Sequence, residues 1–258
     1  MNITQLSELL LNAGLSPEIF YYEKTDSTNT RAREYAKEFR NNREPKLFIA
    51  EEQTAGRGRR GRSFFSEGGV GIYMTLLLYP DERGRDAARL TARAAVALTD
   101  ALCKLTSLSP KIKWVNDVYV KSKKLSGILA EGEMSSDGKA GFVILGMGIN
   151  VYKTAFPDDI SSIATSIEDE CGERISREAL CCEIIKNLLG EPESEEEILK
   201  KYREKSLVIG REITVLPIGK EPYPARAVDI LNDYSLLVKT DSGESISVFS
   251  GEVSVKLS

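Results

Sequence analysis

Apolar side chains recur along the 258-residue chain at spacings that predict both helices and strands. Apolar positions three and four residues apart predict helices over residues 3–13, 85–104, 176–189 and 194–205, and another that follows residues 26–28 and reaches Phe39. Short apolar runs predict strands over 19–23, 46–52 and 71–79, a strand, turn and strand over 111–120, and a hairpin of 125–134 with 140–149 around Asp137-Gly138. Residues 151–175 show neither the helical nor the strand spacing of apolar residues, and we expect them to form a loop. This mixture predicts an α+β fold.

The pattern changes after Gly210, where short β-branched or alternating segments are separated by turn residues. They predict five strands, at 212–217, 223–231, 235–240, 244–248 and 252–257. Short, evenly spaced strands are typical of a small antiparallel barrel. We therefore expect two domains, 1–206 and 207–258, with the second packed on the first because about 50 residues bury little core alone.

The composition is that of a globular protein, and it argues against several classes of function. It is 41% hydrophobic and 29% charged, with a net charge of −4, which argues weakly against nucleic-acid binding through bulk charge. No apolar run is long enough to span a membrane, and the first residues lack the pattern of a secretory signal. The four cysteines show no C-x-x-C spacing, so we expect reduced thiols and a cytoplasmic location.

The chain contains no histidine. Catalytic triads that use imidazole, histidine-bearing zinc sites and imidazole proton shuttles are therefore excluded. The remaining inventory of carboxylates, lysines, arginines and backbone groups suits reactions that proceed by positioning and electrostatic stabilisation.

The most unusual segment is residues 53–71, which we call the Gly-Arg loop. Its start places three glycines among four arginines, at Gly56, Arg57, Gly58, Arg59, Arg60, Gly61 and Arg62. Bare backbone allows close approach, and guanidinium groups match carboxylate and phosphate, so we expect a loop that wraps an anion. The alternative is a solvated basic loop. A dinucleotide fold is rejected because the glycines after Phe65 oppose the helix that such a fold needs.

Three further clusters are candidate site residues. Lys113, Asn116 and Asp117 gather at a predicted turn, and Lys124 directly precedes a strand. For Asn116-Asp117, turn chemistry is an equally good explanation. The glycines before Asn150 suggest close approach of a ligand, with a bulge as the alternative. Residues 26–29, Asp-Ser-Thr-Asn, fit plain helix capping on their own.

Taken in order, these blocks resemble the biotin protein ligases. The matching segments are residues 26–29, 53–62, 113–117 with 124–129, and 146–150, while residues 250–255 resemble the end of that family's small barrel. The resemblance covers nearly the whole chain. Each block alone is a weak signal, but the ordered set is highly specific.

The resemblance implies a catalytic core like that of class II aminoacyl-tRNA synthetases and an SH3-like C-terminal domain. It implies condensation of biotin with ATP to biotinyl-5′-AMP, Mg²⁺ bound to the phosphates, and transfer of biotin to a lysine of a biotin carboxyl carrier domain. Few residues precede the first predicted strand, so we expect a monofunctional ligase without the DNA-binding domain that some members carry. Both a monomer and a homodimer stay open.

The resemblance also assigns residues. Biotin would contact Ser27, Thr28, Asn29, Gln53, Gly56, Arg57, Gly58, Arg59, Lys124 and Gly127. ATP would contact Arg59, Phe64, Lys113, Asn116, Asp117, Lys124 and Asn150. Lys124, Arg59 and Asp117 would be catalytic, and no metal ligand is assigned. Phe64 stands where the family has a tryptophan that stacks on adenine, so we expect weaker stacking, and Val115 and Glu67 replace prolines, which we expect to loosen the turn and the loop.

The missing histidine agrees with this chemistry. The biotin carboxylate is ionised near neutral pH, so its attack on phosphorus needs no base. It needs a cationic cradle, which Arg59 and Lys124 can form. Asp117 is the candidate to orient or deprotonate the acceptor amine in the second step.

Other functions remain open at this point. A lipoate ligase would share the core and the adenylate chemistry, although the Gly-Arg loop and the C-terminal barrel favour biotin. A nucleic-acid-binding protein could use the arginines, and a non-catalytic binder could retain the pocket. We also expect the Gly-Arg loop to be mobile without ligand and ordered with biotinyl-AMP.

Overall fold

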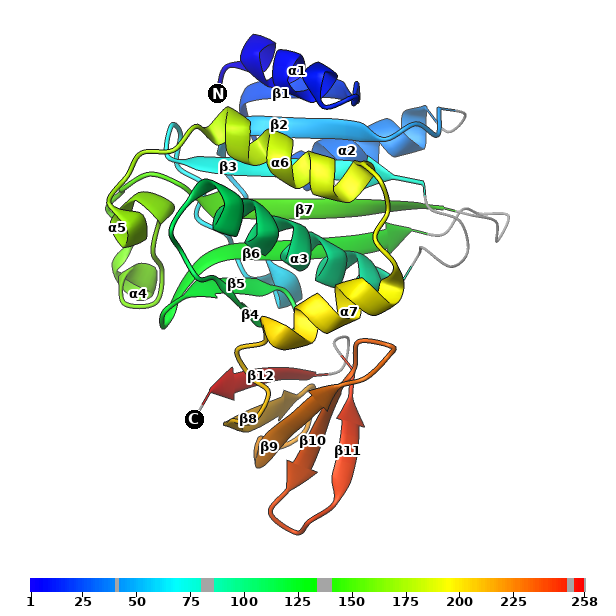
Figure 1. Cartoon of the computed structure of the whole chain (residues 1–258), viewed down its shortest axis with the longest axis vertical. Coiled ribbons are helices and arrows are strands. Elements are labelled where there is room, and N and C mark those ends of the chain that lie inside the picture. The colour runs from blue at the N-terminus through cyan, green and yellow to red at the C-terminus, as the bar shows by residue number, and fades with distance from the viewer. Residues whose placement is uncertain (40–41, 80–85, 134–140, 250–252, 258) are drawn as a thin grey trace.

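The chain folds around two β-sheets, as the computed structural model shows (Figure 1). The structure describes residues 1–39, 42–79, 86–133, 141–249 and 253–257, without the side chains of the last segment. The larger sheet has seven strands in the order β1-β2-β3-β7-β6-β5-β4, and the smaller has five in the order β11-β10-β9-β8-β12. Only β1 and β2 pair in parallel, and all other described pairs are antiparallel. The predicted α+β fold is confirmed.

The elements agree closely with the sequence pattern. The larger sheet contains β1 (Glu18–Thr25), β2 (Lys46–Gln53), β3 (Gly71–Leu78), β4 (Lys111–Lys113), β5 (Asp117–Val120), β6 (Lys123–Glu133) and β7 (Phe142–Asn150). The smaller contains β8 (Glu212–Pro217), β9 (Tyr223–Ile230), β10 (Leu236–Thr240), β11 (Ser245–Val248) and β12 (Val253–Leu257). The main helices are α1 (Ile3–Asn12), α2 (Thr28–Glu38), α3 (Ala87–Leu105), α6 (Arg177–Leu189) and α7 (Glu195–Glu204).

The loop predicted over residues 151–175 is wrong in two places. Short helices occur there, α4 (Asp158–Ser161) and α5 (Ile167–Cys171). Each is too short for a 3.6-residue period to emerge from the sequence. The Ser166 hydroxyl caps α5 by accepting a hydrogen bond from the Asp169 N–H. The predicted turn at Asp137-Gly138, and residues 85, 134, 140 and 250–252 at the ends of predicted segments, lie outside the described residues.

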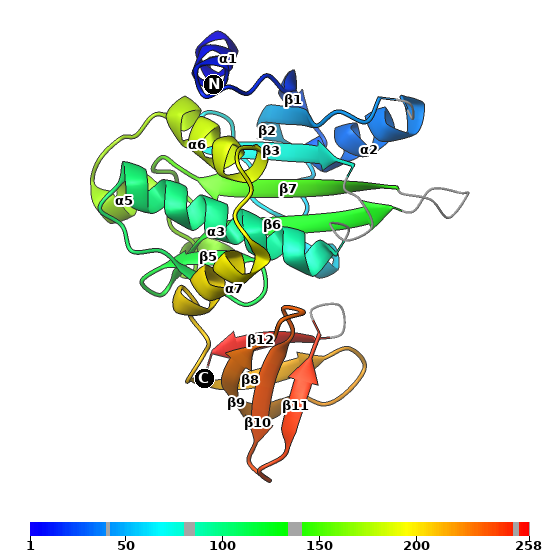
Figure 2. The same ribbon diagram turned by 45° about the vertical axis from the view of Figure 1, so that its right-hand side comes forward.

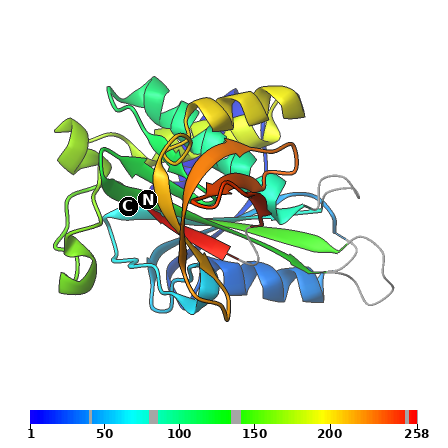
Figure 3. The same cartoon turned by 90° about the horizontal axis from the view of Figure 1, so that it is seen from below.

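The two faces of the larger sheet have different coverings (Figures 2 and 3). Helices α1, α3 and α6 pack on one face and bury the main apolar core. Helix α2 packs on the opposite face, where Ala32 and Ala36 contact Phe48, Leu77 and Ile144. Since α2 covers only part of that face, the remainder over β5 and β6 is available for a cavity. Among the described helices, none has the length and apolarity required to cross a bilayer.

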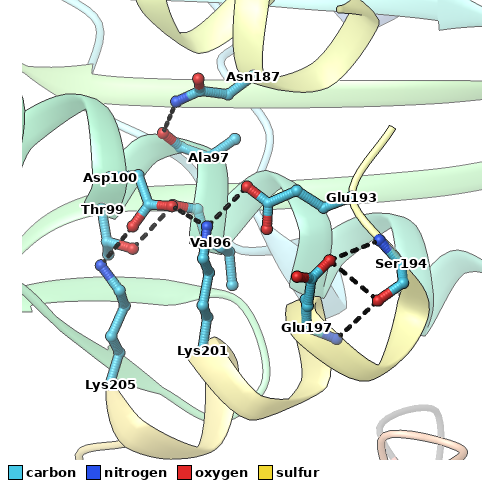
Figure 4. A network of polar contacts seen from close by, with 10 residues as sticks. All are labelled: Val96, Ala97, Thr99, Asp100, Asn187, Glu193, Ser194, Glu197, Lys201 and Lys205. Atoms are coloured by element: carbon cyan, nitrogen blue, oxygen red, sulfur yellow. Dashed lines mark hydrogen bonds and ion pairs between the residues drawn. The ribbon is translucent and has the colours of Figure 1, made fainter. Parts of the chain in front are cut away.

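Helix α7 joins the two sheets and is anchored to α3 by charged side chains (Figure 4). Lys201 and Lys205 both reach the Asp100 carboxylate, at 3.1 and 2.6 Å. Helix α7 begins with a capping box, in which the side chains of Ser194 and Glu197 each accept a hydrogen bond from the other residue's backbone N–H. The core continues from α7 into β8, β9 and β10, so the smaller sheet is packed on the larger unit. The division at residue 207 stays a prediction.

Candidate active site

The uncovered part of the sheet face carries several of the predicted site residues. In the strand register, Lys113 lies opposite Asp117, and Asp117 lies opposite Gly127. Tyr119 lies opposite Lys124. Cross-strand partners share a face, so these residues from β4, β5 and β6 form one surface. They line a cavity of about 510 Å³ together with the start of the Gly-Arg loop.

An ion pair lies inside this cavity. Lys124 Nζ is 2.7 Å from Asp117 Oδ1, and both side chains are partly buried, at 31% and 22% exposed. The Lys124 chain passes over Gly127, where a Cβ atom would lie 3.3 Å from Nζ. Glycine at 127 therefore leaves the room through which the lysine reaches the carboxylate.

Arg59 is the arginine of the Gly-Arg loop that lies deepest. Its Nη1 donates to Asn116 Oδ1 at 3.3 Å, and burial lowers the pKa of its guanidinium. Asn116 is itself held by two hydrogen bonds to Ile128, from its side-chain Nδ2 to the Ile128 carbonyl and from the Ile128 N–H to its own carbonyl. A rigid strand thus positions the asparagine that orients Arg59.

The turn that carries Asn116 and Asp117 is supported from behind. The Tyr202 hydroxyl of α7 donates to the Val115 carbonyl at 2.8 Å, and Trp114 Nε1 donates at 2.9 Å to the Tyr234 carbonyl in the turn between β9 and β10. Tyr202 and Tyr234 are buried and pack edge to face. These contacts hold the turn at Val115, where the sequence predicted loosening. Sequence patterns gave no sign of Tyr202, because its partner is 87 residues away.

The Gly-Arg loop closes on itself. The Gly58 N–H donates to the Arg62 carbonyl at 2.7 Å, and the Phe64 N–H donates to the Gly56 carbonyl at 2.9 Å. Arg60 adopts a left-handed backbone with φ 58° and donates to the Leu216 carbonyl of β8. Arg57, Arg59, Arg60 and Arg62 all line the large cavity, so the loop is part of its wall. Gly56 lines neither cavity.

A second, small cavity of about 20 Å³ adjoins the first beside the N-terminus of α2. Its polar lining includes Ser27, Thr28, Asn29, Gln53 and Arg57. Ser27 occupies the N-cap position of α2, yet its side chain makes no capping hydrogen bond. The capping explanation for this segment therefore fails for Ser27, which lines the small cavity instead.

Phe64 lies between the two cavities and lines both. A Cβ atom at Gly148 would lie 2.4 Å from the Phe64 ring, so this glycine accommodates the phenylalanine in the structure. Phe65, by contrast, packs edge to face on Phe156 in the wall of the large cavity, with the two ring centres 5.9 Å apart. The sequence singled out Phe64 as the aromatic residue of the site but missed the Phe65–Phe156 pair.

Three further residues in the wall of the large cavity carry polar groups. Asn150 lines it, and its Nδ2 donates to the Thr165 carbonyl at 3.0 Å. Lys113 Nζ lies 5.5 Å from the centre of the Tyr119 ring. Burial, with a further contribution from Asp117, raises the pKa of the Tyr119 phenol to about 12. Tyr119 was not predicted, although its alternation with Asp117 on β5 could have placed it on the same face.

The donor set does not fit a metal site made by protein side chains alone. Within the described residues, no three acidic, cysteine or histidine side chains cluster as metal ligands. Asp117 is the one carboxylate among the described residues that line the large cavity, and it is paired with Lys124.

Comparison with known proteins identifies the family. Residues 21–150 match the profile of the biotin/lipoate A/B protein ligase family. The biotin–[acetyl-CoA-carboxylase] ligase of Mycobacterium tuberculosis is 30% identical over 215 residues, which are 80% of this chain and 77% of that protein. The chain belongs to the biotin/lipoate A/B protein ligase family.

Other members of the biotin/lipoate A/B protein ligase family agree with this. The bifunctional ligase/repressor BirA of Bacillus subtilis is 38% identical over 182 residues, 67% of this chain, and the chain spans about half, 54%, of that relative's length. The biotin protein ligase of Aquifex aeolicus, solved in complex with biotin and ATP, superposes with a TM-score of 0.80 at 29% identity, over 93% of this chain and 99% of that one. The fold of both sheets is therefore that of biotin protein ligases.

Proposed function

We propose that this chain condenses biotin with ATP to form biotinyl-5′-AMP and pyrophosphate, and then transfers biotin to a lysine of a biotin carboxyl carrier domain. The observation that carries this proposal is the convergence of Lys124 and Arg59 in a cavity that adjoins a small polar one. The polar lining of the small cavity suits the polar ring of biotin, and the large cavity suits the nucleotide. The family and the superposed Aquifex protein support the same assignment.

In the first step, a carboxylate oxygen of biotin attacks the α-phosphorus of ATP, and the bond to the bridging oxygen of pyrophosphate breaks. The barrier comes largely from bringing two anions together, so fixed cations are the main requirement. Lys124 and Arg59 supply them without needing a proton transfer. Mg²⁺, bound to the phosphates of ATP, would add positive charge there, and no protein residue need hold it.

In the second step, the acceptor amine attacks the acyl carbonyl of the adenylate, the carbonyl–phosphate bond breaks, and AMP leaves. The amine must lose a proton. Once Lys124 turns toward the ligand's carboxylate, the Asp117 carboxylate is free to orient the amine and accept that proton. Tyr119, opposite Lys124 on the neighbouring strand, lies beside the same path.

Biotin must extend from the small cavity to Lys124, and Phe64 lies between them. A cavity of about 20 Å³ has room for little more than a water molecule. We therefore propose that the Phe64 ring leaves Gly148 when biotin binds and then covers the nucleotide, where its aromatic face can contact adenine.

Incubation with ATP, biotin and a carrier domain, read by intact mass, tests this function. We expect the carrier to gain one biotinyl group, and a carrier whose acceptor lysine is replaced by arginine to gain none. Lipoate is the rival substrate, since the family includes lipoate ligases. Thermal stabilisation by lipoate with no effect of biotin would favour the rival.

A further inference from the structure

Two chains of hydrogen bonds converge on the Thr28 hydroxyl at the bottom of the small cavity. One comes through α2 and β3, and the other comes through the Gly-Arg loop. Thr28 is 3% exposed and lines the cavity, so the direction of its hydroxyl proton decides what it offers to a ligand. That direction follows from the groups at the far ends of the two chains.

The first chain begins at Glu131 on β6. Its carboxylate, paired with Arg33 at 3.1 Å, accepts a hydrogen bond from Asn29 Nδ2 at 3.0 Å. An ionised carboxylate only accepts, so the Asn29 amide is oriented with its nitrogen toward Glu131 and its oxygen toward Thr75. Asn29 Oδ1 lies 2.6 Å from Thr75 Oγ1 and can only accept. The single proton of the Thr75 hydroxyl is therefore given to Asn29.

The second chain begins at the Phe64 carbonyl, which accepts from the Ser66 hydroxyl at 3.0 Å. Since Ser66 has given its proton, it accepts from Gln53 Nε2, also at 3.0 Å. Gln53 is thus oriented with Oε1 toward Thr28, where it accepts the Thr28 backbone N–H at 2.8 Å. The Gln53 oxygen can only accept.

Both oxygens beside the Thr28 hydroxyl are therefore acceptors. Thr75 Oγ1 is 2.7 Å away with its own proton committed, and Gln53 Oε1 is 3.1 Å away. Without the Thr28 proton between them, the two threonine oxygens would face each other with no hydrogen at all. The Thr28 proton is consequently used inside the protein, and only oxygen lone pairs remain for the cavity.

We infer that Glu131, Asn29 and Thr75 are specificity-determining positioning residues, because they fix Thr28 as a hydrogen-bond acceptor that selects a ligand ring bearing an N–H group. This rests on the proposed function, which supplies such a ring. A cyclic urea offers N–H donors to Thr28, whereas a dithiolane ring offers none. Asn29, with oxygen and nitrogen both engaged, acts through Thr75.

Two substitutions of Thr75 test this, because they separate volume from hydrogen bonding. Thr75→Val keeps the volume of this fully buried side chain and removes the hydroxyl. Thr75→Ser keeps the hydroxyl and removes the methyl group. We expect Thr75→Val to raise the KM for biotin about tenfold or more, with the KM for ATP unchanged. We expect Thr75→Ser to keep the biotin KM within about twofold of wild type, although it loses more thermal stability through the missing methyl group. Equal increases in both variants, or a wild-type KM in Thr75→Val, would overturn the inference.

A matched pair on β6 provides a second test that does not alter the buried core. Glu131→Gln removes the carboxylate that orients Asn29, while Glu133→Gln removes the neighbouring one, which pairs with Arg33 and Lys37. We expect only Glu131→Gln to raise the biotin KM, by several-fold, and the same rise in both variants would contradict the inference. Wild-type protein that forms no biotinyl-AMP at all would instead refute the proposed function itself, so the two failures are distinguishable.

Discussion

Lys124 and Asp117 meet at 2.7 Å in the large cavity, so the cation expected to hold the biotin carboxylate is fixed by a carboxylate of the protein itself. The group that fixes it is the carboxylate expected to act on the acceptor amine. We expect an anionic ligand at Lys124 to compete with this pair and to release Asp117. Under the proposed function this would order the two half-reactions, since the base would become available only after the first ligand is bound.

Replacement of Asp117 by Asn should separate the two half-reactions. We expect adenylate formation to fall by less than about tenfold, and transfer from preformed biotinyl-AMP to the carrier to slow by about a hundredfold, the usual scale for loss of a general base. Single-turnover transfer measured with purified biotinyl-AMP checks this. Transfer by Asp117→Asn at the wild-type rate would show that Asp117 is not the base for the acceptor amine.

Replacement of Tyr202 by Phe should alter catalysis through the turn that carries Asn116 and Asp117, which the Tyr202 hydroxyl supports. It leaves the Val115 carbonyl without its donor, which costs about 1–3 kcal/mol in unfolding free energy and lets the turn bearing Asn116 shift. We expect a raised KM for ATP and a lower kcat, with the biotin KM unchanged. Tyr234→Phe is the control, because among the described residues its hydroxyl donates to Glu195, away from the turn. Similar kinetics in the two variants would mean that the contact is merely structural.

Acid should weaken the start of α2 through Asp26. Burial raises the pKa of this carboxyl, but hydrogen bonds from Arg31, the Ser27 N–H and Thr25 outweigh that effect and lower the pKa to about 2, from an ordinary value of 3.8. Its contribution to stability is therefore complete above pH 3.8 and is lost as the pH falls through about 2. We expect the Tm of wild type to drop more steeply than that of Asp26→Asn over this range. Parallel curves would contradict the assignment.

The Gly-Arg loop should become ordered when its ligands bind. Its four arginines line the cavity, so anions would replace solvent around their guanidinium groups. We expect slower amide exchange over residues 53–71 with biotin and ATP together, and little change in β8 to β11. Hydrogen–deuterium exchange read by mass spectrometry measures both. Unchanged exchange in the loop would show that it is rigid without ligand.

Local pattern predicted most of the fold because each element has a strong period. Helix α3 carries a continuous apolar stripe, and β8 to β11 alternate between turn residues, so tertiary contacts agree with local preference. Local sequence also places Lys124 close to Asp117, because the two residues lie on adjacent strands joined by a short turn. Helices α4 and α5 were missed because four or five residues carry no period.

Residues whose role depends on distant partners could not be predicted. Thr75 reads as an ordinary buried strand residue, and its importance comes from Asn29, 46 positions earlier. Gly146 and Gly148 suggested close approach of a ligand, but in the structure they make room for the Asn29 and Phe64 side chains. Such pairings arise from strand order, which a period of two or 3.6 does not encode.

The central claim, that Lys124 joins an acid to AMP in this cavity, is tested most directly by biotin-dependent exchange of labelled pyrophosphate into ATP. Lys123, the exposed neighbour, provides the matched control. The account predicts exchange by wild type and Lys123→Ala with biotin, and none by Lys124→Ala at an unchanged Tm, since a partly exposed ion pair adds little stability. Exchange by Lys124→Ala at the wild-type rate, or exchange that requires lipoate instead of biotin, would contradict it.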